Sequence, residues 1–406
     1  MTSHRMRASA ILFSLAMVAA CGGGGGSDGG NGGNNPGPGP GPTPPPSGRS
    51  FYGYLLDEAN NQEQVSIFSA DSAIGELRRV NSVPAAGAAQ LVGAAVVGNR
   101  LYVADFGAYA NPTTGAPRNP GGLRAYSINM ADGALTPITL STYAGFNHPA
   151  GVTVHPQGQF VYTPNFEGQS VSAFRIDSNG ALSGGTNYST NYGGSLNGQN
   201  PAQIAFTPDG RFAYTANKES LSITAFSVNT TTGALTAIQN VPGGIDPISL
   251  AVDPSGRSLY VANNALPDDP ATPAVENNPG TVTMFPINSN GTLGASTSYV
   301  ADILPQSVVV DGSGGAVYVA NSGANNVQIF TRNTTTGALT LARTVAAGTT
   351  PWTLGLCGNS SFLYAANAPK DSGGVTGFAL ANNDISRTLP FTPGSGARAI
   401  ACTAVQ

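Results

Sequence analysis

The sequence predicts an all-β protein, a seven-bladed β-propeller closed by its C-terminal strand. A tyrosine followed three positions later by Asn or Asp recurs seven times, at intervals of 46 to 60 residues. In five repeats a proline opens a short apolar run 13 positions before that tyrosine, as from Pro201 to Tyr214. Repeats of this length without a helical pattern are typical of propeller blades, which bury their faces only against neighbouring blades.

Each repeat contains four predicted strands. The proline-led run is the first and the tyrosine run is the second. The third strand carries an apolar residue and an aromatic three apart, such as Val171 and Phe174. A Gly-x-Leu step introduces the fourth, except that Asn383 and Ile385 replace it in the last repeat. Short runs rich in β-branched and aromatic residues indicate strand. The Asn and Asp residues that end the second strands are Asp57, Asp105, Asn165, Asn217, Asn263, Asn321 and Asn367.

The two ends of the repeat region predict how the ring closes. Residues 397–405 resemble a proline-led first strand, whereas the first repeat begins directly at the strand of Tyr54. We therefore expect the last strand to complete the first blade of a propeller spanning 49–406. Cys357 and Cys402 lie near the ends of first strands in adjacent blades. Their aligned positions differ by one residue, so the sequence does not decide whether the two side chains face each other. The alternatives are a disulfide that locks the ring and two buried free thiols.

The N-terminal segment predicts export. Arg5 and Arg7 precede an apolar run, 8–20, that is too short to span a bilayer and ends in Val-Ala-Ala-Cys. Residues 1–20 resemble a bacterial lipoprotein signal peptide, which implies that Cys21 is lipidated; the alternative is an uncleaved membrane anchor. The Gly/Pro-rich segment 21–48 is expected to be a disordered tether. Because Gly22 rather than Asp follows the cysteine, the resemblance favours the outer membrane, with the propeller in the periplasm or at the cell surface.

Composition excludes several classes of function. Only 9% of residues are charged, and without Arg5 and Arg7 the chain has 15 basic against 21 acidic residues, a net charge of −6. Such a surface does not attract nucleic acid. Two histidines seven positions apart and no Cys pair at metal-ligand spacing predict no metal site, and no cofactor is predicted. An acidic loop with Asp268, Asp269 and Glu276 offers oxygen ligands for calcium but lacks the spacing of a known calcium loop.

One face of the predicted propeller carries the long insertions. These are residues 106–122, 184–200 and 264–281, whereas the turns of the opposite face are short and repetitive. Long loops on a rigid scaffold are the usual place for binding. We expect a small-molecule or protein ligand on this loop-rich face. The protein is expected to be a monomer that contacts the membrane through its lipid anchor only.

Residues beside the opening prolines should ring the mouth of the central channel on that face. His148 is a candidate base and Arg398 a candidate anion ligand. The alternatives are that His148 is a satisfied turn residue and that Arg398 stacks on Trp352. The other candidates for the mouth are Asp246, Trp352, Gln306, Lys218 and Glu219.

Three phrases resemble the blade signature of a known family. They are residues 208–214 (PDGRFAY), 232–235 (TGAL) and 254–263 (PSGRSLYVAN). Over about residues 50–406 the chain is similar to the lactonase-type seven-bladed propellers. These include bacterial 6-phosphogluconolactonases and carboxymuconate-cyclising enzymes, together with the related Tyr-Val-Thr-Asn repeat proteins. The resemblance implies the propeller fold and, for catalytic members, chemistry on lactones.

The catalytic signature of that family is only partly present. Catalytic members carry His-Pro-His in the third blade, Pro-Arg-His opening the fourth, Asn-Glu after its tyrosine strand and a later Pro-Arg. The corresponding residues here are His148-Pro149-Ala150, Pro201-Ala202-Gln203, Asn217-Lys218 and Pro305-Gln306. Lactone opening needs a proton-transfer group and a cation for the developing oxyanion. The sequence therefore predicts a ligand- or protein-binding module; the alternative is a lactone hydrolase using His148 with Arg398 or Glu219 on a sugar lactone or related cyclic ester.

Overall fold

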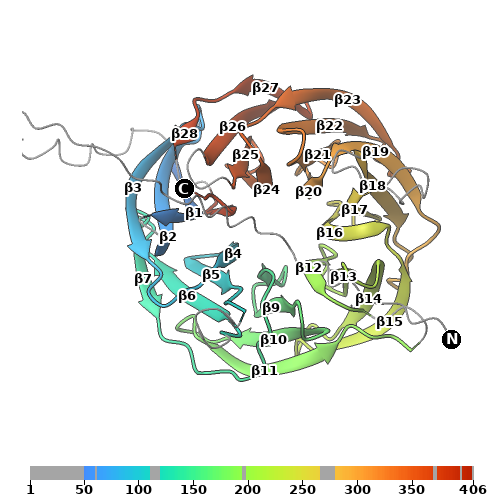
Figure 1. Cartoon of the computed structure of the whole chain (residues 1–406), viewed down its shortest axis with the longest axis horizontal. Coiled ribbons are helices and arrows are strands. Elements are labelled where there is room, and N and C mark those ends of the chain that lie inside the picture. Colours follow the sequence, from blue (N-terminus) through green and yellow to red (C-terminus); the bar gives the residue numbers. More distant parts are fainter. Residues whose placement is uncertain are drawn as a thin grey trace, which may run out of the picture. The chain divides into compact units, whose positions relative to one another are not determined.

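The chain forms seven antiparallel sheets arranged around a central axis (Figure 1). The computed structural model describes residues 50–59, 62–109, 119–193, 198–265, 279–368, 373–393 and 396–404. Among these residues there is no helix, and hence none long and apolar enough to cross a membrane. The predicted signal peptide, Cys21 and the tether lie outside the described residues, as does the acidic loop.

The strands of each sheet follow one another from the axis to the rim, apart from the first blade, whose innermost strand comes from the C-terminus. Blade 1 consists of β29 (Ala399–Cys402), β1 (Ser50–Ala59), β2 (Gln62–Asp71) and β3 (Leu77–Pro84). Blade 2 consists of β4 (Leu91–Val97), β5 (Arg100–Asp105), β6 (Gly122–Ile128) and β7 (Leu135–Ile138). Blade 3 consists of β8 (Thr153–Val154), β9 (Phe160–Asn165), β10 (Ser170–Ile176) and β11 (Leu182–Ser189).

Blades 4 to 7 repeat this order. Blade 4 consists of β12 (Pro201–Phe206), β13 (Phe212–Asn217), β14 (Ser222–Val228) and β15 (Leu235–Pro242). Blade 5 consists of β16 (Ile245–Val252), β17 (Ser258–Ala265), β18 (Pro279–Pro286) and β19 (Thr297–Ile303). Blade 6 consists of β20 (Pro305–Val310), β21 (Ala316–Asn321), β22 (Asn326–Arg332) and β23 (Leu339–Ala346). Blade 7 consists of β24 (Pro351–Cys357), β25 (Phe362–Asn367), β26 (Gly374–Ala381), β27 (Asp384–Thr388) and the short β28 (Thr392–Pro393).

The predicted closure of the ring is confirmed. Strand β29 pairs antiparallel with β1, with Gly53 opposite Cys402 and Leu56 opposite Ala399. Beyond the strand, the amide of Thr403 donates to the carbonyl of Tyr52 over 2.9 Å, and the Tyr52 amide donates to Thr403 Oγ1 over 3.0 Å. The two ends of the described propeller thus share one sheet, so that β1 has a partner on each side.

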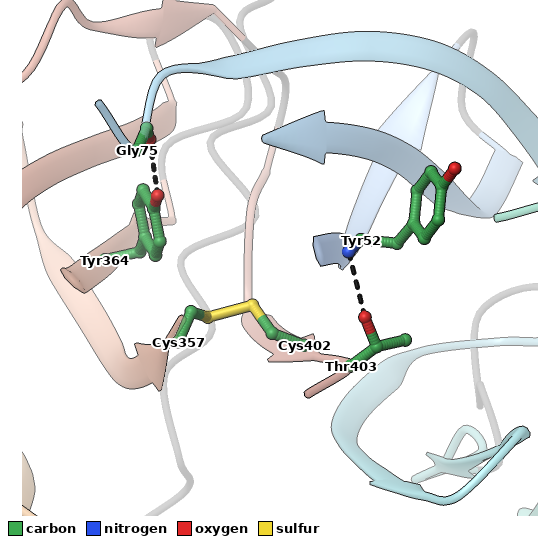
Figure 2. The surroundings of a disulfide bond; sticks show 6 residues. All are labelled: Tyr52, Gly75, Cys357, Tyr364, Cys402 and Thr403. Atoms are coloured by element: carbon green, nitrogen blue, oxygen red, sulfur yellow. Dashed lines mark hydrogen bonds between the residues drawn. A yellow bond between two sulfur atoms is a disulfide. The ribbon is translucent and has the colours of Figure 1, made fainter. Parts of the chain in front are cut away.

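Cys357 at the end of β24 and Cys402 at the end of β29 are joined by a disulfide (Figure 2). Their Cα atoms lie 5.6 Å apart, within the usual range for a bridge. Of the two alternatives left open by the sequence, the structure has the bridge, despite the one-residue offset. The disulfide links blade 7 to the closing strand of blade 1.

The repeated tyrosines connect each blade to the next. Tyr214 is fully buried, and its hydroxyl donates to the carbonyl of Gly291, the glycine of the next blade's Gly-x-Leu step, over 3.0 Å. Equivalent bonds join Tyr54 to Gly133, Tyr102 to Gly180, Tyr162 to Gly233, Tyr260 to Gly337 and, across the closure, Tyr364 to Gly75. Burial raises the pKa of Tyr102 to about 12. Both motif positions are therefore explained by one inter-blade hydrogen bond.

The bond is missing at the one repeat without the glycine. Tyr318 of blade 6 faces blade 7, where Asn383 replaces the glycine, and within the described part of the chain its buried hydroxyl has no partner. An unpaired buried hydroxyl costs free energy. The seam between blades 6 and 7 therefore lacks the tyrosine bond of the six others, and Ser313 of blade 6 instead donates to Asn383 Oδ1 over 2.6 Å.

Candidate functional site

A strained backbone position recurs where the chain enters each first strand. The residue before the opening proline has a positive φ in five blades although none is glycine, a conformation that side chains disfavour. These residues are His148 (56°), Asn200 (53°), Asp246 (52°), Leu304 (53°) and Thr350 (51°). Because five blades share the conformation with five different side chains, it belongs to the blade geometry. The conformation fixes the position of these side chains in each blade, whereas the residue type differs from blade to blade.

The residue after the proline sits in a β-bulge. The pairing register of β12, β16, β20 and β24 with their neighbours shifts between the proline and the second residue beyond it. The intervening residues are Ala202, Ile248, Gln306 and Trp352. A bulge redirects the side chain of its extra residue. The predicted mouth positions are therefore structurally equivalent, and each is partly buried.

His148 occupies the environment of a satisfied turn residue. Its side chain is fully buried, and Nδ1 lies 2.8 Å from the carbonyl oxygen of Phe106. The imidazole packs against two aromatic rings, with centroids 4.7 Å from Phe106 and 4.6 Å from Tyr109. Nε2 is 3.8 Å from Oε2 of Glu167. The imidazole is thus shielded from solvent, whereas Glu167 beside it is partly exposed.

Arg398 is held by acidic residues of the first blade. Its Nη1 donates to Glu63 Oε1, and Nη2 lies 3.8 Å from Glu58 Oε2. Glu63 is buried and also accepts a hydrogen bond from the Leu91 amide over 3.2 Å. Burial raises the pKa of Glu63, while Arg398 opposes the rise. The guanidinium predicted to hold an anion is thus already paired with carboxylates of this chain, because ring closure brings β1 and β2 beside the last strand.

The remaining candidates are brought together only in part. Lys218 Nζ lies 4.0 Å from Asp246 Oδ2, which joins two predicted residues from neighbouring blades in an ion pair. Glu219 is exposed. Within the described part of the chain, neither Arg398 nor Glu219 bonds to His148. The combination of His148 with Arg398 or Glu219, predicted for lactone hydrolysis, is therefore not assembled by direct contact.

Glu167 is the residue that the sequence interpretation missed. It follows Asn165 by two positions, as Glu219 follows Asn217, so the repeat alignment contained the signal. Its side chain is 33% exposed beside the buried His148. It also lines a hollow of about 510 Å³ at the edge of blade 3. A carboxylate that touches an imidazole on one side and an open hollow on the other has the geometry of an acid–base residue.

One of the predicted loop insertions is partly a β-strand. Of the predicted insertion 184–200, residues up to Ser189 belong to β11, so the connection to blade 4 is shorter than expected. Residues 110–118, 194–197 and 266–278 lie outside the described residues, and with them Asp268, Asp269 and Glu276 of the calcium hypothesis. Among the described residues no group of three or more His, Cys, Asp and Glu is arranged to hold a metal ion.

Comparisons with known proteins agree with this architecture. The profile of the family described as "Lactonase, 7-bladed beta-propeller" matches residues 54–195, 178–266 and 276–354. A 6-phosphogluconolactonase of Formosa agariphila is 36% identical over 118 residues, 28% of this chain and 33% of that protein. A 6-phosphogluconolactonase of Serratia proteamaculans is 21% identical over 280 residues, 67% of this chain and 76% of that protein.

Two solved structures share the fold. A crystal structure described as a putative 6-phosphogluconolactonase from Bacteroides uniformis superposes with a TM-score of 0.70 at 16% identity, over 87% of this chain and 99% of that one. The Pseudomonas aeruginosa periplasmic gluconolactonase gives a TM-score of 0.67 at 16% identity, over 88% of this chain and 100% of that one. The match to the family profile, which covers well over half of the sequence, places the chain in the family of seven-bladed β-propeller lactonases.

Proposed function

We propose that this chain is a lactone hydrolase that acts on an uncharged sugar lactone. Membership of the lactonase family and the similarity to curated 6-phosphogluconolactonases support lactone chemistry. The observation that carries the proposal is the pair formed by Glu167 and His148, with 3.8 Å between Oε2 and Nε2. In this proposal Glu167 takes a proton from the water that attacks the lactone carbonyl and returns it to the ring oxygen when the acyl C–O bond breaks. His148, with its Nδ1 proton donated to the carbonyl of Phe106, presents Nε2 to accept from the protonated carboxyl in between.

The proposed substrate is uncharged because the basic side chains that the structure describes near the mouth are already paired with carboxylates. Arg398 is paired with Glu63 and Glu58, and Lys218 lies beside Asp246. Arg124, at the corresponding end of blade 2, lies 3.5 Å from Asp105. Binding a phosphate dianion requires cations that the protein does not already use, whereas hydroxyl groups of a sugar are bound by neutral polar groups.

The test is hydrolysis of glucono-δ-lactone by the full-length chain and by Glu167→Gln. Loss of a general base is expected to lower kcat by about 10²–10⁴-fold. Gln157→Ala, which removes an exposed amide from the turn between β8 and β9 at the other end of blade 3, is the control and should keep the activity. Wild-type rates equal to spontaneous hydrolysis, or full activity in Glu167→Gln, would contradict the proposal.

A second candidate function is binding without catalysis. The pairing of Arg398 and Lys218 with carboxylates favours it, because no unpaired guanidinium or ammonium among these mouth residues is left to stabilise an oxyanion. In that case the lactone, another small molecule or a protein binds to the loop-rich face without turnover. Saturable binding of glucono-δ-lactone or a partner protein, with hydrolysis at background, would support this candidate over the first.

We also propose that the propeller is exported and tethered to the membrane through lipidated Cys21, favouring the outer membrane. The motif Val-Ala-Ala-Cys after a short apolar run and the Gly/Pro-rich segment support this location. Metabolic labelling with a radioactive fatty acid should mark the wild type and leave Cys21→Ser unlabelled and released into the soluble fraction. Labelling that persists in Cys21→Ser would contradict the anchor.

A further inference from the structure

The hollow at the edge of blade 3 is lined almost entirely by neutral polar groups. It measures about 510 Å³, which is room for one or two sugar rings. Its lining consists of Asn147, Glu167, Gly168, Gln169, Ser170, Asn187, Ser189 and Asn191. Asn147 precedes the first strand of blade 3, residues 167–170 form the turn into β10, and the others lie in the second half of β11 or just beyond it. The hollow therefore extends along one end of blade 3 to β11, the outermost strand of that blade (Figure 1). No lysine or arginine is among the described residues that line it.

One side of the hollow is fixed by its own hydrogen bonds. Asn187 Oδ1 accepts from Tyr143 over 2.9 Å and from Ser172 over 2.5 Å. Its Nδ2 donates to the carbonyl of Gly145 over 3.0 Å. Asn165, fully buried, donates to Ser172 over 2.8 Å. This wall is therefore pre-organised, and binding does not have to order it.

Other groups at the hollow retain hydrogen-bonding capacity. Gln169 Oε1 accepts from Asn191 over 3.4 Å, and within the described residues the amide nitrogen of Gln169 has no partner. Ser189 Oγ accepts from the Asn191 amide over 3.1 Å, which leaves its own hydrogen to donate. The side chain of Glu167, a carboxylate, is 33% exposed and also lines the hollow. Amide donors, a hydroxyl and a carboxylate together match vicinal sugar hydroxyls, each of which both donates and accepts.

Two exposed tyrosines neighbour the lining residues, one in sequence and one through His148. Tyr192, which follows Asn191, is 44% exposed. Tyr109, packed against His148, which lies beside Glu167, is 51% exposed. An exposed tyrosine offers an apolar ring with a polar tip, which suits the C–H face of a pyranose as well as its hydroxyls.

We propose that this hollow is a binding subsite for an uncharged saccharide unit. The negative charge of Glu167 and the lack of a cation among the described lining residues disfavour an anion such as phosphate. A calcium site is disfavoured because the lining provides only one carboxylate. The subsite lies beside Glu167 and extends away from the axis, so it takes a sugar unit next to the reacting lactone or a free saccharide. The assignment of this subsite is based on the residues that line the hollow, and it does not require that the chain hydrolyses lactones.

The test is calorimetric titration of the full-length chain with D-glucose, maltose and glucose 6-phosphate. The wild type should bind a neutral sugar, and glucose 6-phosphate at least tenfold more weakly. Gln169→Asn is the variant of choice, because Gln169 has a φ of 46°, which asparagine tolerates, and the shorter side chain withdraws the amide. It should weaken binding of the neutral sugar about tenfold, with an unchanged Tm.

Two further variants keep the outcomes distinct. Tyr192→Ala should weaken binding, whereas Gln157→Asn, which shortens an exposed amide in the turn between β8 and β9 at the other end of blade 3, should not. No binding of any of the three sugars to the wild type, equal affinity of Gln169→Asn, or a loss confined to Gln157→Asn would each overturn the proposal. Because binding and hydrolysis are measured separately, a failure here is distinguishable from a failure of the lactonase proposal.

Discussion

At the scale of single residues, the end of each second strand is held by one Asn or Asp side chain. Asn217 in blade 4 donates to Ser222 over 3.3 Å and to Thr224 over 2.9 Å, which ties the second strand to the third. Asp57 in blade 1 has no hydrogen to donate when ionised and instead accepts from Ser66 over 2.9 Å. Burial raises the pKa of Asp57 to about 6, although its hydrogen bonds to Ser66 and Gln64 oppose the rise.

The raised pKa predicts a decrease in stability between about pH 4 and pH 6. In this range the folded protein binds more protons at Asp57 than the unfolded chain, so the free energy of unfolding falls as pH rises through it. The fall is at most about 3 kcal/mol. Asp57→Asn should remove this fall. The free energy of unfolding of both proteins is measured by urea denaturation at pH 4 and pH 7.5. The reciprocal Asn217→Asp should introduce a similar fall; identical pH profiles for wild type and Asp57→Asn would contradict the assignment.

The tyrosine bonds give a second prediction at this scale. Tyr214→Phe removes the hydroxyl that donates to Gly291 and should lower the free energy of unfolding by about 1 kcal/mol. Tyr318→Phe is the matched control, because it removes a buried hydroxyl without a partner in the described structure and should be neutral or stabilising. Equal losses in both variants, measured by chemical denaturation, would show that the inter-blade bond is not what stabilises the seam.

At the scale of elements, the closing strand should decide whether the ring holds. Deleting residues 397–406 removes β29, which leaves the inner edge of β1 unpaired. We expect a lower Tm and concentration-dependent aggregation, followed by light scattering. A truncated chain that stayed monomeric and as stable as the wild type would contradict the role of the strand.

The disulfide contributes separately from the strand. Cys357 and Cys402 are 45 positions apart, and a cross-link over such a loop stabilises by about 3–4 kcal/mol in the chain-entropy description. Replacing both cysteines with serine should therefore lower the Tm but keep the propeller monomeric, since β29 remains. Reductant should destabilise the wild type and leave the double variant unchanged; equal sensitivity of both proteins to reductant would argue against the bridge.

The sequence predicted most elements because each blade repeats local signals. The proline-led run, the tyrosine strand and the Gly-x-Leu step all recur, and each occupies the same place in its sheet. The mouth positions were predictable for the same reason. What each side chain contacts was not: Arg398 and Glu63 are 335 positions apart and meet only because the ring closes. Glu167 was missed although it aligns with Glu219. The repeat predicts where such a residue lies in its blade, but the contact of Glu167 with the buried His148 is specific to blade 3.

At the scale of the whole molecule, the account rests on charge. The chain is acidic, and on the loop-rich face Arg398, Lys218 and Arg124 each lie beside a carboxylate. The described residues of this face therefore attract an anionic ligand only weakly, whereas a neutral hydroxylated ligand meets no unfavourable charge from them. The proposed uncharged lactone and the proposed saccharide subsite are therefore two consequences of one distribution of charge, and they share Glu167.

The most direct measurement of this claim compares two substrates on the full-length chain: glucono-δ-lactone and its 6-phosphorylated form, each corrected for spontaneous hydrolysis. The account predicts that kcat/KM for the uncharged lactone is at least tenfold higher and that adding salt changes it little. A preference for the phosphorylated lactone that weakens as salt is added would contradict it, because that result requires an unpaired cation in the site.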